Sequence, residues 1–157
     1  MPSERQARTR RPLRAALAAA ALAAWLLPTA ARAAEIVVVL NEKNAVSTVS
    51  LQQLRLIYGA YRRSWPDGTP IQLLLPAAGS PAMQVMVTKV FRRQREEEIA
   101  QYYVDLVFQQ KLVKPPAQAS IRESLARVRS QPGAIVIAEK DEIDDPSGLR
   151  LLPLEGL

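Results

Sequence analysis

Three short apolar segments, residues 35–40, 71–75 and 134–138, constrain the fold of this chain more than any other feature. Each is about strand length, is bounded by polar or turn residues, and lacks the polar alternation of a half-exposed strand. Such runs are typical of strands whose two faces are both covered by helices. Residues 149–154 are predicted to form a further strand at the end of the chain. The segments therefore predict an α/β fold with a mixed sheet covered by helices.

Helix starts lie between these strands. Ser50 with Gln53, and Ser120 with Glu123, fit the capping box, in which two side chains satisfy amides of the first helical turn. Ser80-Pro81 suits the N-cap and the first helical position. The acidic residues 96–98 suit the positive end of a helix dipole. Four helices are therefore expected, three of them between the second and third strands.

Each helix start is followed by apolar residues at helical spacing. These residues are Leu51, Leu54, Ile57 and Tyr58; Met83, Met86, Val87, Val90 and Phe91; Ile99, Tyr102, Tyr103, Leu106 and Val107; and Ile121, Leu125 and Val128. Gly59 is expected to end the first helix, and residues 65–68 and 131–133 read as turns that contain Pro and Gly. Residues 141–147 are expected to form an acidic loop.

Residues 1–33 have the three parts of a secretory signal peptide. An arginine-rich start is followed by an uncharged run over residues 15–27, by Pro28, and by the small-residue site Ala31-Arg32-Ala33. We expect cleavage near Ala34, a periplasmic domain over residues 34–157, and Sec export, with a partial twin-arginine match at residues 9–13 as the alternative route. An uncleaved N-terminal anchor is the other reading. No Cys follows the apolar run, which argues against a lipoprotein.

The charge of the chain belongs mainly to that segment. The whole sequence has 21 Lys and Arg against 15 Asp and Glu, a formal net charge of +6. Six of the basic residues and one acidic residue lie in residues 1–33, so 15 and 14 remain and residues 34–157 carry +1. A nearly neutral domain lacks the basic excess that nucleic-acid binding requires, and we expect no nucleic-acid partner.

The sequence contains no Cys and no His. This composition excludes thiol catalysis, disulfides, Cys/His zinc sites and a Ser-His-Asp triad. No carboxylate pair or nucleophile–base pair is placed for catalysis, so we expect neither an enzyme nor a cofactor. The acidic clusters at residues 96–98 and 141–145 do not fit a calcium loop, and no metal site is expected.

One basic stretch interrupts the predicted strands and helices. Arg62 and Arg63 lie between Tyr61 and Trp65. These side chains are suited to an anionic surface, although a solvated loop of mixed role explains the same composition.

The order of these motifs resembles the phosphate-type periplasmic solute-binding proteins of ABC transporters. The resemblance rests on the helix start at residues 47–59, the Trp-Pro-Asp-Gly turn at residues 65–68, Gly79-Ser80 before a helix with Phe91, and the later residues 131–137. It covers residues 35–140 and implies a single lobe of the type 2 periplasmic-binding fold, because the family proteins have two lobes and about twice this length. It also implies a phosphate-binding loop at a helix N-terminus.

That loop departs from the family pattern. Pro81 and Ala82 stand where the family has its second Gly and its Thr, while Pro76 and Ala78 stand where it has an Arg and an acid. Without that Arg, the charge-assisted contact that makes phosphate binding strong is missing. Weak anion binding is expected at a candidate site that consists of Gly79, Ser80, Ala82 and Met83.

Two functions remain open on the sequence. The first is an exported, non-catalytic domain that binds phosphate or another small anion weakly and is linked to phosphate ABC transport. The second is a periplasmic protein–protein interaction module that kept the fold and lost the ligand. The four substitutions in the loop favour the second on physical grounds, whereas the resemblance favours the first.

Overall fold

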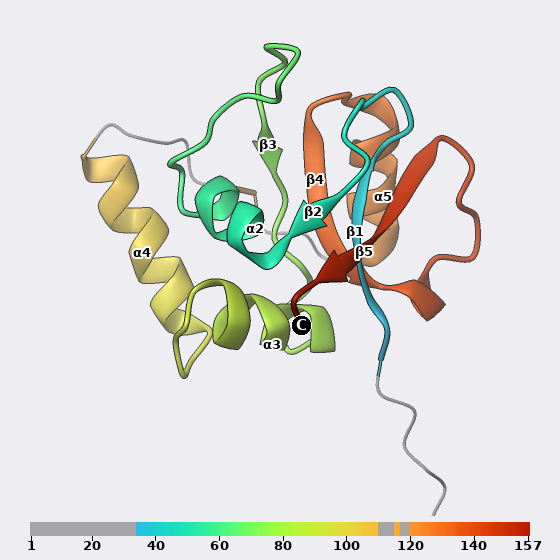
Figure 1. Ribbon diagram of the computed structural model, residues 1–157. Coiled ribbons are helices and arrows are strands. Elements are labelled where there is room, and N and C mark those ends of the chain that lie inside the picture. The colour runs from blue at the N-terminus through green and yellow to red at the C-terminus, as the bar shows by residue number, and fades with distance from the viewer. Residues whose placement is uncertain (1–33, 110–114, 117–119) are drawn as a thin grey trace, which may run out of the picture. The chain divides into compact units, whose positions relative to one another are not determined.

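The computed structural model describes residues 34–109, 115–116 and 120–157, so the predicted signal peptide lies outside the described residues. The elements, shown in Figure 1, are β1 (Ile36–Asn41), β2 (Val49–Ser50), α2 (Leu51–Tyr58), β3 (Gln72–Leu73), α3 (Pro81–Val85), the π-helix η2 (Met86–Val90), α4 (Glu97–Phe108), α5 (Ile121–Ser130), β4 (Ala134–Glu139), the 3₁₀-helix η3 (Lys140–Glu142) and β5 (Leu149–Glu155). None of the helices in this described part is both long enough and apolar enough to cross a membrane.

The strands form one mixed sheet in the order β2-β5-β1-β4-β3. β1 lies at the centre and is antiparallel to both of its neighbours, with Val38 opposite Ile137 on β4 and Leu152 on β5. The edge strands are short and parallel to the strands beside them, β2 to β5 and β3 to β4. The predicted mixed α/β architecture is confirmed.

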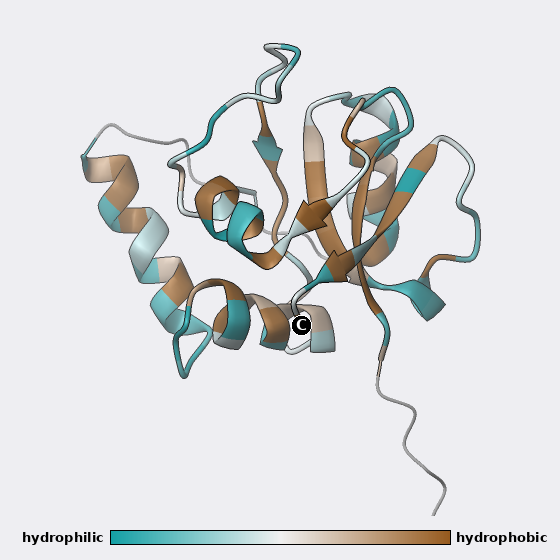
Figure 2. Ribbon diagram, viewed as in Figure 1, coloured by the Kyte–Doolittle hydropathy of each residue, from teal (hydrophilic) through white to brown (hydrophobic). Residues whose placement is uncertain are grey.

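Helices cover both faces of the sheet, as the apolar strands require. All six residues of β1 are buried, and successive side chains point to opposite faces. Val38 and Leu40 belong to the larger core, which includes side chains of α2, α3, η2 and α4. Val37 and Val39 belong to a smaller core with α5. Figure 2 shows β1 and β4 almost continuously hydrophobic, whereas α5 has hydrophobic and polar sides.

The helix caps confirm most of the predicted starts. Ser50 and Gln53 make both bonds of a capping box, at 3.2 Å and 2.8 Å. Ser120 makes only half of one, because its Oγ accepts from the amide of Glu123 at 3.3 Å while the Glu123 carboxylate pairs with Arg127. At Ser120 the structure therefore has the serine half of the predicted capping box, and the Glu123 carboxylate pairs with Arg127 four residues further along the helix.

The helix predicted after Ser80 changes its winding midway. It begins as α3 and continues as the π-helix η2, in which the amide of Phe91 donates to the carbonyl of Met86 at 2.9 Å. The guanidinium of Arg55 donates through Nε and Nη2 to the carbonyl of Lys89, at 3.1 Å and 2.9 Å. The predicted apolar positions keep their place in the core, since Met83, Met86, Val87 and Val90 are all buried.

Three further details differ from the sequence prediction. The strand expected over residues 71–75 pairs only through Gln72 and Leu73, although the amide of Leu74 still bonds to Ile135. β2 was not predicted, because its two residues are ordered by pairing with the distant β5. On α4, Val107 is 41% exposed rather than part of the apolar face.

Two buried tyrosines connect α2 and α4 to the sheet. Tyr58 is fully buried and donates from its hydroxyl to the carbonyl of Leu74 at 3.0 Å, with the carbonyl of Ile135 at 3.3 Å. Tyr103 on α4 donates to the carbonyl of Tyr58 at 2.9 Å. These hydroxyls satisfy backbone acceptors that water does not reach.

Replacing Tyr58 with Phe should lower the free energy of unfolding by about 1–2 kcal/mol, because buried carbonyls lose their donor. Chemical denaturation would measure the change. Tyr61→Phe is the matched control, since Tyr61 is 80% exposed and its hydroxyl should contribute little. Equal stability of the two variants would contradict this role of Tyr58.

Burial raises the pKa of the Tyr58 and Tyr103 hydroxyls above the usual value of about 10. Above that pH the unfolded chain ionises while the folded chain keeps both protons, so the free energy of unfolding should fall as the pH rises. The expected slope is about 1.4 kcal/mol per pH unit for each buried tyrosine. Denaturation at a series of alkaline pH values would measure it, and Tyr103→Phe should reduce the slope.

Candidate functional site

The predicted anion-binding residues follow β3 on a tight turn that leads into α3. The amide of Ser80 donates to the carbonyl of Ala77 at 3.2 Å, and Gly79 has a φ of +73°. A residue with a side chain would be strained in this left-handed conformation, so glycine is required here. The turn brings Gly79 and Ser80 next to the start of the helix, as predicted.

The helix start uses its own polar groups. Ser80 is the N-cap, and its Oγ accepts from the amide of Met83 at 3.0 Å. Pro81 has no amide hydrogen to offer. The side chains of Ala82 and Met83 are 2% and 5% exposed and lie in the larger core. The Ser80 hydroxyl and the amide of Met83, which both belong to the predicted anion site, are therefore bonded to each other.

A carboxylate of the chain itself bonds to the remaining part of the loop. Glu96, the residue before α4, accepts from the amide of Gly79 through Oε2 at 3.1 Å. The contact joins residues 17 positions apart in the sequence. An anion that approached this amide would meet a negative charge already bonded to it, which is the reverse of the arrangement that phosphate loops use.

Beside the loop lies a cavity of about 30 Å³. It is lined by Pro76, Ala77, Ser80, Ala82, Ile121, Ser124, Ile137, Ala138 and Glu142. A cavity of this size has room for a water molecule or two. No Lys or Arg is among these described lining residues, whereas Glu142 brings a carboxylate to the edge of the cavity.

The surroundings of the Glu142 carboxylate disfavour its charged form. Partial burial, and then the neighbouring Glu139, raise the pKa of Glu142. A raised carboxyl pKa means that the surroundings disfavour negative charge at this place. The same surroundings would disfavour a small anion in the cavity.

A larger, open depression of about 250 Å³ lies at the opposite end of β1, where the strand runs into its following loop. Residues 44–48 and Trp65, Pro66 and Asp67 line it. The Trp65 side chain is 4% exposed, and its indole donates to the carbonyl of Gly133 at 3.1 Å, so it serves the core of the turn. None of the predicted site residues lines this depression.

The acidic clusters at residues 96–98 and 141–145 were considered above as metal sites. Among the residues that the structure describes, no group of three or more acidic side chains is placed to hold a metal ion. Asp145 instead accepts from the amide of Ser147 and pairs with Arg129, at 2.9 Å and 3.7 Å. Hydrogen bonding from the side chain and then the amide of Ser147, together with the charge of Arg129, lowers the pKa of Asp145.

Solved structures with this fold are phosphate-type substrate-binding proteins. One from Clostridium perfringens, assigned as a phosphate ABC transporter substrate-binding protein and crystallised with bound phosphate, aligns at a TM-score of 0.57 with 16% identity over 79% of this chain and 46% of that one. PstS from Borrelia burgdorferi aligns at 0.56 with 12% identity over 78% and 48%. A protein from Planctomyces limnophilus, assigned as phosphate-binding, aligns at 0.53 with 18% identity over 78% and 42%.

These alignments confirm the predicted fold. The chain matches a little under half of each solved structure, and it has the fold of one lobe of a periplasmic substrate-binding protein. A scan against models of known protein families finds no match, and neither does a search of curated proteins. At these identities the likeness concerns the fold alone.

The two carboxylates beside the loop were not predicted from the sequence. Glu96 is predicted at the start of α4, and the structure agrees. Glu142 is predicted in an acidic loop, but it is the last residue of the 3₁₀-helix η3. Neither position carries a sequence signal for contact with Gly79 or Ser80, because the sheet and the helix turn bring them together.

Ser80→Ala should lower the free energy of unfolding by about 1 kcal/mol, because the amide of Met83 loses its acceptor. Ser47→Ala is the control, since Ser47 is exposed and precedes β2 without capping a helix. Chemical denaturation would measure both variants. An unchanged Ser80→Ala protein would show that the hydroxyl is free for a ligand rather than used by the fold.

Proposed function

We propose that this chain is an exported, non-catalytic domain with the fold of one lobe of a phosphate-binding protein, and that it acts by contacting another protein. The bond between Glu96 and the amide of Gly79 carries this proposal. The loop in which a related protein would hold phosphate is satisfied by the chain's own carboxylate.

The surroundings of the loop support the same reading. Ser80 Oγ is engaged by the amide of Met83, Pro81 has no amide hydrogen, and the adjoining cavity offers Glu142 rather than a cation. Strong phosphate binding uses arginine forks and several free amides in a water-excluded site. A single open lobe leaves any bound anion in contact with water, which screens each charge.

The place of action follows from residues 1–33. Their basic start, apolar run and Ala-Arg-Ala site favour export to a bacterial periplasm through the Sec route. The solved Clostridium perfringens protein of this fold is assigned to phosphate ABC transport, which favours a role connected with solute uptake at the same location. Within that role, we propose a partner protein rather than a substrate as the binding target.

Weak anion binding is the second candidate. The observation that favours it is the Clostridium perfringens structure, which has this fold and holds phosphate. In this case Gly79, Ser80, Ala82 and Met83 would form the site, and Glu96 would have to move away from Gly79 before an anion entered.

Thermal denaturation with phosphate or sulfate distinguishes the two candidates. A ligand of the folded state at about 100 times its Kd stabilises by about 2.7 kcal/mol, which raises the melting temperature by several degrees. We expect no such rise at millimolar anion, because the amides of Gly79, Ser80 and Met83 are already bonded within the chain. Calorimetric titration would provide an independent measurement on the same protein.

Glu96→Gln is the informative variant, since it removes the charge next to Gly79 while it keeps an oxygen acceptor. A saturable response of the wild-type protein to phosphate that is lost in Ser80→Ala would refute the partner proposal and support the anion site. A response that appears only in Glu96→Gln would show that the carboxylate blocks an otherwise competent loop.

A further inference from the structure

The loop between α2 and β3 presents an aromatic side chain to solvent. Tyr61 is 80% exposed, whereas Tyr58 and Tyr103 are at most 1% exposed. Arg62 and Arg63 follow it and are also exposed. Burial of the Tyr61 ring would be favourable by the area that it removes from water, so its exposure on a folded domain calls for an explanation.

The backbone holds this loop in one conformation. The amides of Tyr61 and Arg62 both donate to the carbonyl of Leu56, each at 2.9 Å, and the amide of Ile71 donates to the carbonyl of Arg63 at 2.9 Å. Ala60 has a φ of +61°, a left-handed conformation that is unfavourable for a residue with a Cβ. Strain of this kind at a non-glycine residue is found where a loop is shaped for a purpose.

Gly59 makes room for the exposed ring. Gly59 has an ordinary φ of −74°, so its role is not the left-handed cap that ends many helices. A Cβ at this position would lie 2.6 Å from the carbonyl oxygen of Arg55 and 2.9 Å from Cδ2 of Tyr61. The Tyr61 ring therefore lies against the backbone of Gly59 on one side, and most of its surface is exposed to solvent.

A packed aromatic cluster supports the loop. Tyr102 on α4 donates from its hydroxyl to the carbonyl of Gly59 at 2.8 Å. The rings of Phe91, Tyr102 and Tyr103 meet edge to face, with centroids 5.3 to 5.9 Å apart. Burial and the nearby Tyr61 raise the pKa of Tyr102, while Arg93 lowers it, so Tyr61 and Arg93 both lie near this hydroxyl.

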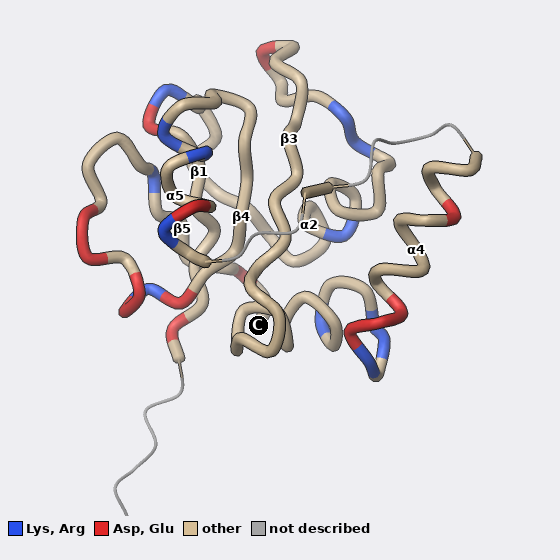
Figure 3. Tube along the Cα trace, turned by 180° about the vertical axis from the view of Figure 1, so that it is seen from behind, with Lys and Arg blue, Asp and Glu red and all other residues tan. Residues whose placement is uncertain are grey.

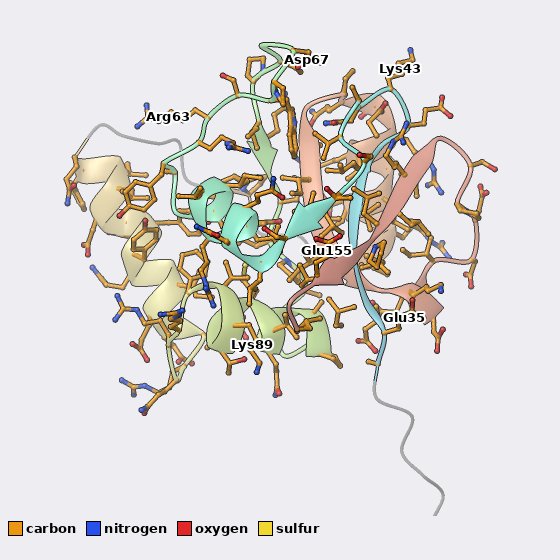
Figure 4. All side chains as sticks on the ribbon, in the orientation of Figure 1. Glu35, Lys43, Arg63, Asp67, Lys89 and Glu155 are labelled. Carbon is orange, nitrogen blue, oxygen red and sulfur yellow. The ribbon has the colours of Figure 1, made fainter. Side chains whose placement is uncertain are left out.

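The cations here have no acidic partner among the described residues. Four ion pairs are present in that part of the chain, and none includes Arg62, Arg63 or Arg93. The acid that follows Arg63 most closely, Asp67, accepts from the amide of Thr69. The acid closest in sequence to Arg93 is Glu96, which accepts from the amide of Gly79. Figure 3 shows the Arg62–Arg63 stretch without an adjoining acid, whereas acids gather in the loop between β4 and β5. Figure 4 shows the Arg63 side chain projecting away from the domain.

We propose that the surface formed by Tyr61, Arg62, Arg63 and Arg93, called here the Tyr61 surface, docks an acidic segment of a partner protein. Tyrosine and arginine are the residue types most enriched at the energetic centres of protein interfaces. Unpaired guanidinium groups on a rigid loop suit carboxylates, which they bind with two parallel hydrogen bonds. The inference rests on the proposed function and adds where the contact is made and what it recognises.

A protein segment fits this surface better than a lipid surface does. Membrane association of a folded domain draws on a broad apolar face that enters the headgroup region. Here one large ring is supported against the backbone, and its neighbours are charged. A ring and cations that are already held in place lose little conformational freedom on binding, which favours a partner protein of complementary shape and charge.

The test is a random peptide library displayed on phage and selected against the immobilised protein. Enriched peptides should be acidic, and their affinity should fall about tenfold or more in Arg62→Glu/Arg63→Glu. Lys43→Glu/Arg122→Glu is the matched control, because it reverses two exposed cations outside the Tyr61 surface and should change affinity less than about twofold. Tyr61→Ala should weaken binding without removing a charge, and melting curves would confirm that each variant folds.

The other outcomes separate the two proposals. Enriched peptides whose affinity is the same for both charge-reversal variants would overturn the Tyr61 surface, while the interaction function would stand. A failure to enrich any peptide would count against both. Binding to phosphatidylglycerol vesicles that is lost in Arg62→Glu/Arg63→Glu, without peptide binding, would overturn the protein partner in favour of an anionic lipid surface.

Discussion

The structure depends on the burial of β1 from both sides. Its six residues are buried, and it forms both antiparallel ladders of the sheet. Because its side chains alternate between two cores, helices must cover both faces, α5 on one and the other helices on the opposite one. At the end of the strand, the side-chain amide of Asn41 donates through Nδ2 to the carbonyls of Val128 and Arg129, at 2.8 Å and 2.9 Å. These bonds attach the last turn of α5 to the sheet.

The hydrophobic core and the loop at Gly79 place different demands on the sequence. The core needs apolar residues at spacings that many sequences satisfy, which explains how a lobe with 12–18% identity keeps the fold. The loop at Gly79 needs particular donors and cations, and single substitutions remove them. Pro81 has no amide hydrogen, Pro76 brings no charge, and Glu96 bonds to the amide of Gly79. These observations support the proposal that the domain contacts another protein, since function is located in sites rather than in folds.

Local signals in the sequence predicted local structure well. The caps at Ser50 and Ser80 and the strand of residues 134–138 were correct, because each depends on neighbours within a few positions. The cap at Ser120 shows the limit of a motif, since only its serine half forms. β2 was missed because its partner β5 lies far along the chain. The π-helical winding of η2 was missed because the spacing of its apolar residues still fits a helix.

The sequence by itself determined the α/β class, the helix starts, the near-neutral charge of residues 34–157 and the absence of thiol and imidazole chemistry. These properties follow from composition, spacing and single turns. Only the tertiary structure decided what the Gly79 amide bonds to and that Tyr61 remains exposed while Tyr103 is buried. Glu96 and Gly79 are 17 residues apart, and the burial of Tyr103 but not Tyr61 depends on where α4 packs. Contacts of this kind depend on how elements meet in space, so the spacing of residues along the chain carries no signal for them.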